Sequence, residues 1–191
     1  MDNDPFDQIQ IVMLVTQLMA KRQFDELGSL ACQDERVLQH LTRKLRDGAG
    51  PSCFSAATAL SKAGQPAVRP LLTASTDDNY IVRQLAALAL GDIGDLRALH
   101  ALVSRLGDDN EVVRQAAAVS LGKLGSPDAV VPLLHAMDDE SELVRRAAVN
   151  ALGLIGDPRA LPQLRRAAAE DVDVVAKRAR EVAREMAEHE R

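Results

Sequence analysis

Three arginines recur at a fixed spacing in the second half of the sequence. Arg83, Arg114 and Arg145 are each separated by 31 residues. A pair of acidic residues stands five and six positions before each one, and these pairs are Asp77-Asp78, Asp108-Asp109 and Asp139-Glu140. A guanidinium can donate to the carbonyls of a turn and hold a carboxylate through two parallel hydrogen bonds. We therefore predict a structural ladder of Arg83, Arg114 and Arg145 that ties turns of the chain, in preference to a ligand site.

His100 and Ser104 are the pair that most resembles catalytic machinery. Four residues separate them, so on a helix they would share one face. A nucleophilic serine also needs its histidine oriented by a third group, usually an acid. No such acid stands with this pair in the sequence, so we predict no catalytic residues.

Two cysteines, Cys32 and Cys53, are the whole thiol content of the chain. Their spacing matches neither a metal site nor a disulfide framework. We expect both to be reduced and packed within helices, as is typical of a cytoplasmic protein.

The elements that position these residues repeat with the same period as the arginines. Gly94, Gly125 and Gly156 recur in step with the arginine ladder. Repetition at this period predicts a solenoid, in which stacked repeats share one core. Aromatic residues make up 2% of the chain and there is no tryptophan, so small and aliphatic side chains must form that core. The composition favours an all-α fold.

Helix boundaries follow from caps and apolar periodicity. We expect helices over about 5–20, 22–31, 34–46, 52–63 and 66–75, then two helices in each of the repeats 77–107, 108–138 and 139–169, and a last helix over 173–188. Asn79, Asn110 and Ser141 are placed to cap the first helix of their repeats. The three periodic glycines stand where that helix must end, because a left-handed C-cap favours glycine.

These elements predict one continuous domain with three parts. Residues 1–50 form an N-terminal capping helix and a degenerate repeat. Residues 51–171 form four repeats of about 31 residues each, and residues 172–191 form a C-terminal capping helix. Such end helices give a solenoid a polar outer face.

The run from Val144 to Leu161, VRRAAVNALGLIGDPRAL, resembles the HEAT-like repeats of the phycobilisome lyase (PBS lyase) family. The resemblance covers about residues 51–171. It implies a right-handed α-α superhelix of stacked antiparallel helix pairs, with the second helices lining a concave surface. Proteins with such repeats include lyase subunits, di-iron hydroxylases, DNA-binding enzymes and scaffolds, so function has to be argued from the site.

The di-iron hydroxylases that share these repeats depend on several His-Glu pairs. This sequence has one such pair, His189-Glu190 near its C-terminus, and a single pair does not hold two irons. We therefore predict no metal and no cofactor. The role of accessory subunit of a bilin lyase-like or other modifying enzyme stays open as the alternative function, since no short catalytic signature decides it.

A basic row lies on the second helices although the net charge is −5. Helical periodicity and the resemblance place these residues on the concave face: Arg43, Arg69, Arg97, His100, Ser104, Arg105, His135, Arg159, Gln163 and Arg166. Such a row favours an acidic partner, although exposed helix faces often carry arginine without any binding role. Nucleic acid is a less favoured partner, since no aromatic residue stands in the row to stack on bases. The favoured function is a non-catalytic scaffold or adaptor that binds another protein in the concave groove.

The N-terminal helix is apolar over more than one face. Its apolar residues are Ile9, Ile11, Val12, Met13, Leu14, Val15 and Leu18. A capping helix needs only one buried face, so the excess indicates either burial on two sides or a self-association surface, and of these we favour a homodimer through this helix. The apolar run is too short and too interrupted by glutamines to span a membrane.

Overall fold

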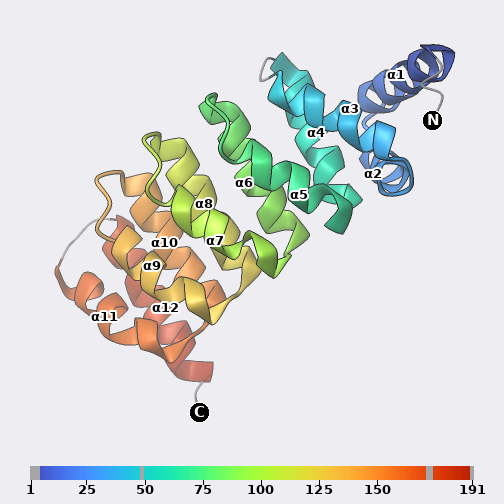
Figure 1. Ribbon diagram of the computed structural model, residues 1–191. Coiled ribbons are helices and arrows are strands. Elements are labelled where there is room, and N and C mark those ends of the chain that lie inside the picture. Colours follow the sequence, from blue (N-terminus) through green and yellow to red (C-terminus); the bar gives the residue numbers. More distant parts are fainter. Residues whose placement is uncertain (1–4, 48–49, 171–173, 190–191) are drawn as a thin grey trace. The chain divides into compact units, whose positions relative to one another are not determined.

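The computed structural model describes residues 5–47, 50–170 and 174–189, and every regular element within these ranges is a helix (Figure 1). The chain divides into two compact units, Met1–Ile93 and Gly94–Arg191. The division falls inside the expected repeat 77–107, between its two helices. The three-part organisation of one continuous domain therefore remains a prediction.

Unit 1 contains six α-helices in the ranges that the structure describes: α1 (Pro5–Ala20), α2 (Phe24–Gln33), α3 (Glu35–Arg46), α4 (Gly50–Ala63), α5 (Gln65–Ala74) and α6 (Tyr80–Ile93). Helix α4 packs between α2 and α6, while α3 and α5 pack against each other and against α4 and α6 respectively. Leucines fill the space between the helices α2, α4 and α6 on one side and α3 and α5 on the other. Leu41, Leu60, Leu71 and Leu90 are fully buried.

Unit 2 repeats this arrangement. Its elements are η1 (Leu96–Ala98), α7 (Leu99–Arg105), α8 (Glu111–Leu124), η2 (Pro127–Ala129), α9 (Val130–Ala136), α10 (Glu142–Ile155), η3 (Pro158–Ala160), α11 (Leu161–Glu170) and α12 (Val174–His189). Helix α10 packs between α8 and α12, and α7, α9 and α11 pack against α8, α10 and α12 in turn. Each 3-10 turn begins a second helix, a feature that the apolar pattern did not predict.

The expected caps are largely confirmed. Gly94, Gly125 and Gly156 all have φ near +70°, in the left-handed region that glycine adopts most readily. The side chains of Asn79 and Asn110 accept hydrogen bonds from the backbone N–H two residues later. The expectation for Ser141 is wrong, because its side chain makes no capping hydrogen bond; its own backbone N–H instead donates to Asp139.

The start of α2 and one of the cysteines also differ from expectation. The helix expected from residue 22 begins at Phe24, because Arg22 adopts a left-handed conformation with φ of 55°. Its N–H donates to Met19 O and the N–H of Gln23 donates to Leu18 O, which is the pattern that closes a helix C-terminus. Both cysteines are free thiols, but only Cys53 is buried while Cys32 is exposed.

Candidate functional site

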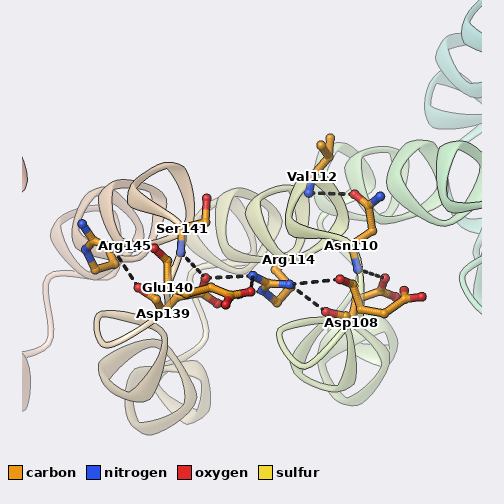
Figure 2. A network of polar contacts seen from close by, with 9 residues as sticks. Asp108, Asn110, Val112, Arg114, Asp139, Glu140, Ser141 and Arg145 are labelled. Carbon is orange, nitrogen blue, oxygen red and sulfur yellow. Dashed lines mark hydrogen bonds and ion pairs between the residues drawn. The ribbon is translucent and has the colours of Figure 1, made fainter.

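Arg114 links the turn before its own helix to the turn before the next one (Figure 2). Its Nη1 donates to the carbonyl of Asp108 at 3.0 Å. Its Nε and Nη2 donate to the two carboxylate oxygens of Asp139 at 2.8 and 3.0 Å, and Nη2 also reaches Glu140 at 3.2 Å. The side chains of Arg114 and Asp139 are 9% and 12% exposed, so this two-pronged ion pair is largely shielded from water.

Arg83 and Arg145 make the same carbonyl contacts at the equivalent turns. Arg83 donates from Nη1 to the carbonyls of Asp77 and Asp78 at 3.0 and 2.9 Å. Arg145 donates from Nη1 to the carbonyls of Asp139 and Glu140 at 2.9 and 3.0 Å. All three arginines therefore donate to backbone carbonyls of the acidic residues that precede them.

Asp139 shows how burial and pairing compete at the ladder. Burial would raise the pKa of its carboxyl, but hydrogen bonds from Arg114 and from the Ser141 N–H, with the charges of Arg114 and Arg145, lower it overall. The same ion pair raises the pKa of Arg114. Both groups are held in their charged forms, which suits a structural link better than proton transfer.

Two arginines of the basic row are paired with acids close by in the chain. Arg97 forms a two-pronged ion pair with Asp95, with Nη2 to Oδ2 at 2.6 Å. Arg159 binds Asp157 in the same way and also donates to the carbonyl of Pro127. The hydrogen bond from Arg97 lowers the pKa of Asp95 to about 2. Much of the positive charge that the sequence placed on these two positions is thus neutralised locally.

The structure corrects the expectation that Arg105 points freely into solvent. Its side chain is 21% exposed and lies 3.2 Å from Asp108, whose side chain is 2% exposed. Asp108 also accepts a hydrogen bond from the backbone N–H of Asn110. The positive charge of Arg105 therefore offsets a buried carboxylate, because an unpaired buried charge is costly.

The remaining row residues of unit 2 are exposed or half-buried on its second helices. His100 and Ser104 are exposed on α7, His135 is exposed on α9, and α11 carries a half-buried Gln163 and an exposed Arg166. They give unit 2 an exposed polar set along its second helices.

A cleft lies between α3 and α5 in unit 1. Its volume is about 570 Å³, and its lining residues are Glu35, Leu38, Gln39, Thr42, Arg43, Arg46, Asp47, Pro70 and Asp77. Of the basic row, Arg43 is at this cleft, while Arg69 is exposed on α5. Leu38 and Pro70 provide apolar surface between the polar groups.

Charges at the cleft are only partly paired. Arg46 donates from Nε to Asp77 at 3.3 Å, and Glu35 accepts a hydrogen bond from Gln39. In the described part of the chain, the guanidinium groups of Arg43 and Arg69 make no hydrogen bond or ion pair. These two arginines are the row residues of unit 1 whose charge is available to a ligand.

Sequence reasoning missed Leu38, Arg46 and Asp77 as cleft residues. Asp77 was predicted only as an acid of the arginine ladder. The proline inside α5, Pro70, was the available signal, since a proline removes a backbone N–H and places a rigid apolar ring on a helix surface.

Metal binding and membrane insertion find no support in the described residues. No group of three or more His, Cys, Asp or Glu residues in these ranges is arranged to hold a metal ion. No helix in the same ranges is both long and apolar enough to cross a membrane. The predicted His189-Glu190 pair lies partly outside the described residues.

The sequence matches the family described as HEAT repeats over residues 52–122, 69–142 and 101–184. The chain belongs to the HEAT-repeat family. This match confirms the repeat class that residues 144–161 indicated. Comparison with curated proteins found no match.

Solved structures with HEAT or related repeats are similar in fold. The complex of CpcE and CpcF of phycocyanin lyase from Nostoc sp. PCC7120 is 27% identical, with a TM-score of 0.71 over 79% of this chain and 99% of that one. Human deoxyhypusine hydroxylase is also 27% identical, with a TM-score of 0.55 over 94% of this chain and 74% of that one. A designed armadillo repeat protein in complex with the peptide (KR)4 is 21% identical, with a TM-score of 0.57 over 93% and 98%. The last likeness concerns the fold alone.

Proposed function

We propose that this HEAT-repeat protein is a non-catalytic scaffold or adaptor in the cytoplasm, and that it binds an acidic segment of another protein along its second helices. The cleft between α3 and α5 is the anchor of this site. The observation that carries the proposal is that Arg43, which lines the cleft, and Arg69, which is exposed on α5, make no ion pair within the described residues. Their charge is available to a ligand, unlike that of Arg97 or Arg159.

The chemistry of the cleft favours a short segment with alternating acidic and apolar side chains. A carboxylate can accept two parallel hydrogen bonds from each guanidinium. An apolar side chain can pack on Leu38 and Pro70, while the amide of Gln39 at the cleft wall can bond to the backbone of the segment. Tight peptide binding usually combines such apolar anchors with a few placed polar groups.

The acidic residues that line the cleft favour a protein over a nucleic acid as the partner. Glu35, Asp47 and Asp77 line the same cleft, and a polyanion with evenly spaced phosphates could not avoid them. A protein segment can place single carboxylates at Arg43 and Arg69 only. In unit 2, His100, Ser104, His135, Gln163 and Arg166 are a second candidate set for contact with a protein partner, considered apart from the cleft of unit 1.

Binding of short labelled peptides tests the anchor directly. We expect fluorescence anisotropy to detect binding of an acidic, leucine-containing peptide but not of its lysine-substituted counterpart. Combined Arg43→Glu and Arg69→Glu substitutions should remove the binding, and higher salt should weaken it, because exposed charges are screened over about 8–10 Å at physiological ionic strength.

The matched control changes the net charge by the same amount as the cleft variant, but at residues of α8 and α12. Lys123 on α8 and Arg184 on α12 are exposed, and reversing both to Glu alters the total charge as much as the cleft variant does. If this control weakens binding as much as the cleft variant, the attraction is non-specific and the cleft is not the site. Circular dichroism of each variant checks that it is folded.

A second candidate function is an accessory subunit of a bilin lyase-like or other modifying enzyme. The similarity that spans 99% of a chain in the phycocyanin lyase complex favours it. Co-expression with a phycobiliprotein and its bilin would test this role, with covalent bilin attachment read by absorbance. Attachment that depends on this chain would favour the lyase role over a plain scaffold.

We also propose that the chain forms a homodimer through α1. Ile9 and Met13 on this helix are 59% and 67% exposed, and Val12 and Leu14 are exposed as well. Large apolar side chains gathered on one exposed helix are typical of an association surface. Sedimentation of the full chain and of a Met13→Glu variant tests this: a full chain that stays monomeric at every concentration rejects the homodimer.

A further inference from the structure

Two neighbouring residues of α4 reverse the polarity that later repeats have at the same positions. Phe54 stands ten residues before Gly64, the glycine that directly follows α4. At the same distance before Gly94, Gly125 and Gly156, the later repeats have polar residues, which are Gln84, Gln115 and Arg146. Ser55 stands where the later repeats have the buried residues Leu85, Ala116 and Ala147. Because the same helix forms elsewhere with the opposite polarity, the fold does not require either residue, and such departures are expected at functional sites.

A cavity lies beside these two residues, between the turn after α1 and the first half of α4. Its volume is about 580 Å³, and its lining residues are Arg22, Phe24, Gly50, Pro51, Phe54, Ser55 and Thr58. Two of the three phenylalanines of the chain are therefore at one site, although aromatic residues make up only 2% of the sequence. Phe54 is 53% exposed. A cavity of this size with mostly apolar walls is typical of small-molecule sites.

Two polar groups at this cavity have no partner in the described part of the chain. The guanidinium of Arg22 makes no hydrogen bond or ion pair there, and the hydroxyl of the half-buried Ser55 makes no hydrogen bond. Arg22 also has a φ of 55°, and backbone strain of this kind is often found at binding sites. A carboxylate can accept hydrogen bonds from a guanidinium and a hydroxyl together. The lining residues thus include the groups that bind one anion beside apolar surface.

A second cavity adjoins the first at Phe54 and Thr58, which line both. Its volume is about 220 Å³, and its other lining residues, from α4 and α6, are Ala57, Leu85, Leu88, Ala89 and Asp92. Pro51 and Thr58 are seven residues apart in the sequence, which is about 10 Å along the axis of α4. An extended apolar chain that begins in the first cavity can therefore continue across Phe54 toward Leu85. Asp92 disfavours a second negative charge at that end.

We propose that these two cavities bind a small monocarboxylate with an apolar chain of medium length. Its carboxylate lies at Arg22 and Ser55, and its chain lies across Phe54. A peptide is a poorer fit, because its backbone N–H and C=O groups would need polar partners that this lining largely lacks. The Thr58 hydroxyl already donates to the carbonyl of Phe54 at 2.9 Å. This site is separate from the cleft between α3 and α5 and does not depend on the proposed scaffold function.

Calorimetric titration of the full chain with octanoate tests the proposal. We expect saturable binding at one site, and an affinity lower by about tenfold or more for 1-octanol, which has a chain of the same length and no charge. Octanedioate should also bind more weakly than octanoate, because its second carboxylate would lie on apolar surface near Asp92. Absence of saturable octanoate binding, or equal affinities for octanoate and 1-octanol, would overturn the proposal.

Three substitutions locate the ligand in the cavity. Arg22→Gly suits the left-handed backbone and removes the cation, so octanoate affinity should fall about tenfold or more, while Arg22→Lys keeps a charge and should retain part of it. Ser55→Ala introduces the residue that Ala116 and Ala147 provide in later repeats, so the variant should fold normally and bind about threefold or more weakly. Phe54→Ala should weaken binding about tenfold, because it removes the exposed ring.

Lys21→Gln and Met13→Glu are the matched controls. Lys21→Gln removes one positive charge beside Arg22, at a residue that does not line either cavity. Met13→Glu alters the exposed apolar surface of α1, to which an amphipathic molecule could adhere. Octanoate should raise the melting temperature of the unmodified chain and of both controls, but not that of Arg22→Gly. If either control loses as much affinity as Arg22→Gly, octanoate binds elsewhere and the proposal fails.

A peptide with a free C-terminal leucine distinguishes a small carboxylate from the end of a protein chain. It carries a carboxylate next to an apolar side chain, but its backbone also brings amide groups to the cavity. We expect this peptide not to displace octanoate in a competition titration. A peptide that binds at Arg22 and Phe54 while octanoate does not would overturn the proposal and assign the cavities to a protein terminus.

Discussion

At the scale of single residues, the arginines of this protein differ in what lies within reach of each guanidinium. Arg114 spans two turns and is almost buried, Arg97 is bound to an aspartate two residues before it, and Arg43 has no ion-pair partner in the described residues. The same side chain therefore serves as a structural link, a local cap and a candidate ligand contact. Only the last of these leaves charge available for a partner.

Arg105→Ala should cost more stability than an exposed arginine normally would. The substitution removes the cation that lies 3.2 Å from the carboxylate of Asp108, whose side chain is 2% exposed. We expect a loss of about 1–3 kcal/mol in the free energy of unfolding, measured by urea denaturation. Arg69→Ala, at an exposed position without an ion pair, is the comparison and should cost under about 0.5 kcal/mol. Equal losses for the two would contradict the pairing of Arg105.

His40 should make stability depend on pH. Its Nε2 is buried and has no partner in the described part of the chain, and burial together with the charges of Lys44 and Arg43 lowers the pKa of its imidazole. The unfolded chain then binds a proton more readily, so stability is full above the ordinary pKa of about 6.5 and is lost as pH falls below it. Denaturation midpoints between pH 7.5 and 5 should fall in the unmodified chain and fall less in His40→Gln. Equal slopes would exclude His40 as the cause.

The spacing of the arginine ladder could be predicted from the sequence, whereas the local pairing of the basic row was missed. Periodicity assigns a side chain to a face but does not choose its rotamer. A signal was nevertheless present, because Asp95 precedes Arg97 by two residues just as Asp157 precedes Arg159. An aspartate that caps a helix can hold an arginine at that distance, so the repeated motif indicated neutralised charge.

At the scale of elements, helix ends depend on backbone conformation more than on apolar pattern. The three periodic glycines were identified correctly, since only a left-handed residue closes those helices. The end of α1 at Ala20 was also predicted correctly, but the start of α2 was not, because Arg22 is the one non-glycine residue with positive φ in the described ranges. An arginine in the sequence does not predict a left-handed backbone conformation.

Arg22→Gly should raise stability. Glycine adopts the left-handed region without the steric cost that other residues bear, and we expect a gain of about 0.5–1 kcal/mol. The measurement belongs in a Met13→Glu background, so that any change in dimerisation does not contribute. Lys21→Gly, at a neighbouring position with negative φ, should change stability in the opposite direction. A loss in both variants would argue against strain at Arg22.

Close packing of α8 on α10 depends on Gly122. A β-carbon at this position would lie 2.8 Å from Ala151 Cα, a backbone atom that cannot move without shifting the helix. We expect Gly122→Ala to lower stability by about 1–3 kcal/mol, although alanine favours helices by up to about 1 kcal/mol over glycine. Gly107→Ala is the control, since its nearest contact would be at 3.8 Å. Thermal denaturation should leave the control nearly unchanged, and equal effects would show that packing is not the cause.

At the scale of the whole molecule, the sequence predicted the all-helical repeat class because the same pattern of arginine, glycine and apolar residues recurs along the chain. It did not predict the division between α6 and η1. Because the repeats are similar in sequence, no residue pattern marks the boundary between the two units, which depends on the sum of many contacts. The order of the helices and their buried faces followed from the period alone.

Arg114→Ala should weaken the connection between successive repeats in unit 2. Removing one partner of a buried ion pair costs about 3–5 kcal/mol, and Asp139 would lose both of its guanidinium hydrogen bonds. Arg114→Lys should recover little, because an ammonium cannot reproduce the planar two-pronged contact. Equilibrium denaturation monitored by circular dichroism measures both variants, and full recovery by lysine would show that charge alone matters.

The arginine ladder has a consequence for how such a chain can change in length. Arg114 contacts its own turn, which starts with Asp108, and the turn of the following repeat, which starts with Asp139. In a tandem duplication of residues 108–138, Arg114 of the first copy would therefore meet Asp108 of the second copy in the place of Asp139, and Arg114 of the second copy would meet Asp139. A gene encoding this protein could gain or lose 31 codons at that position and still specify a folded product.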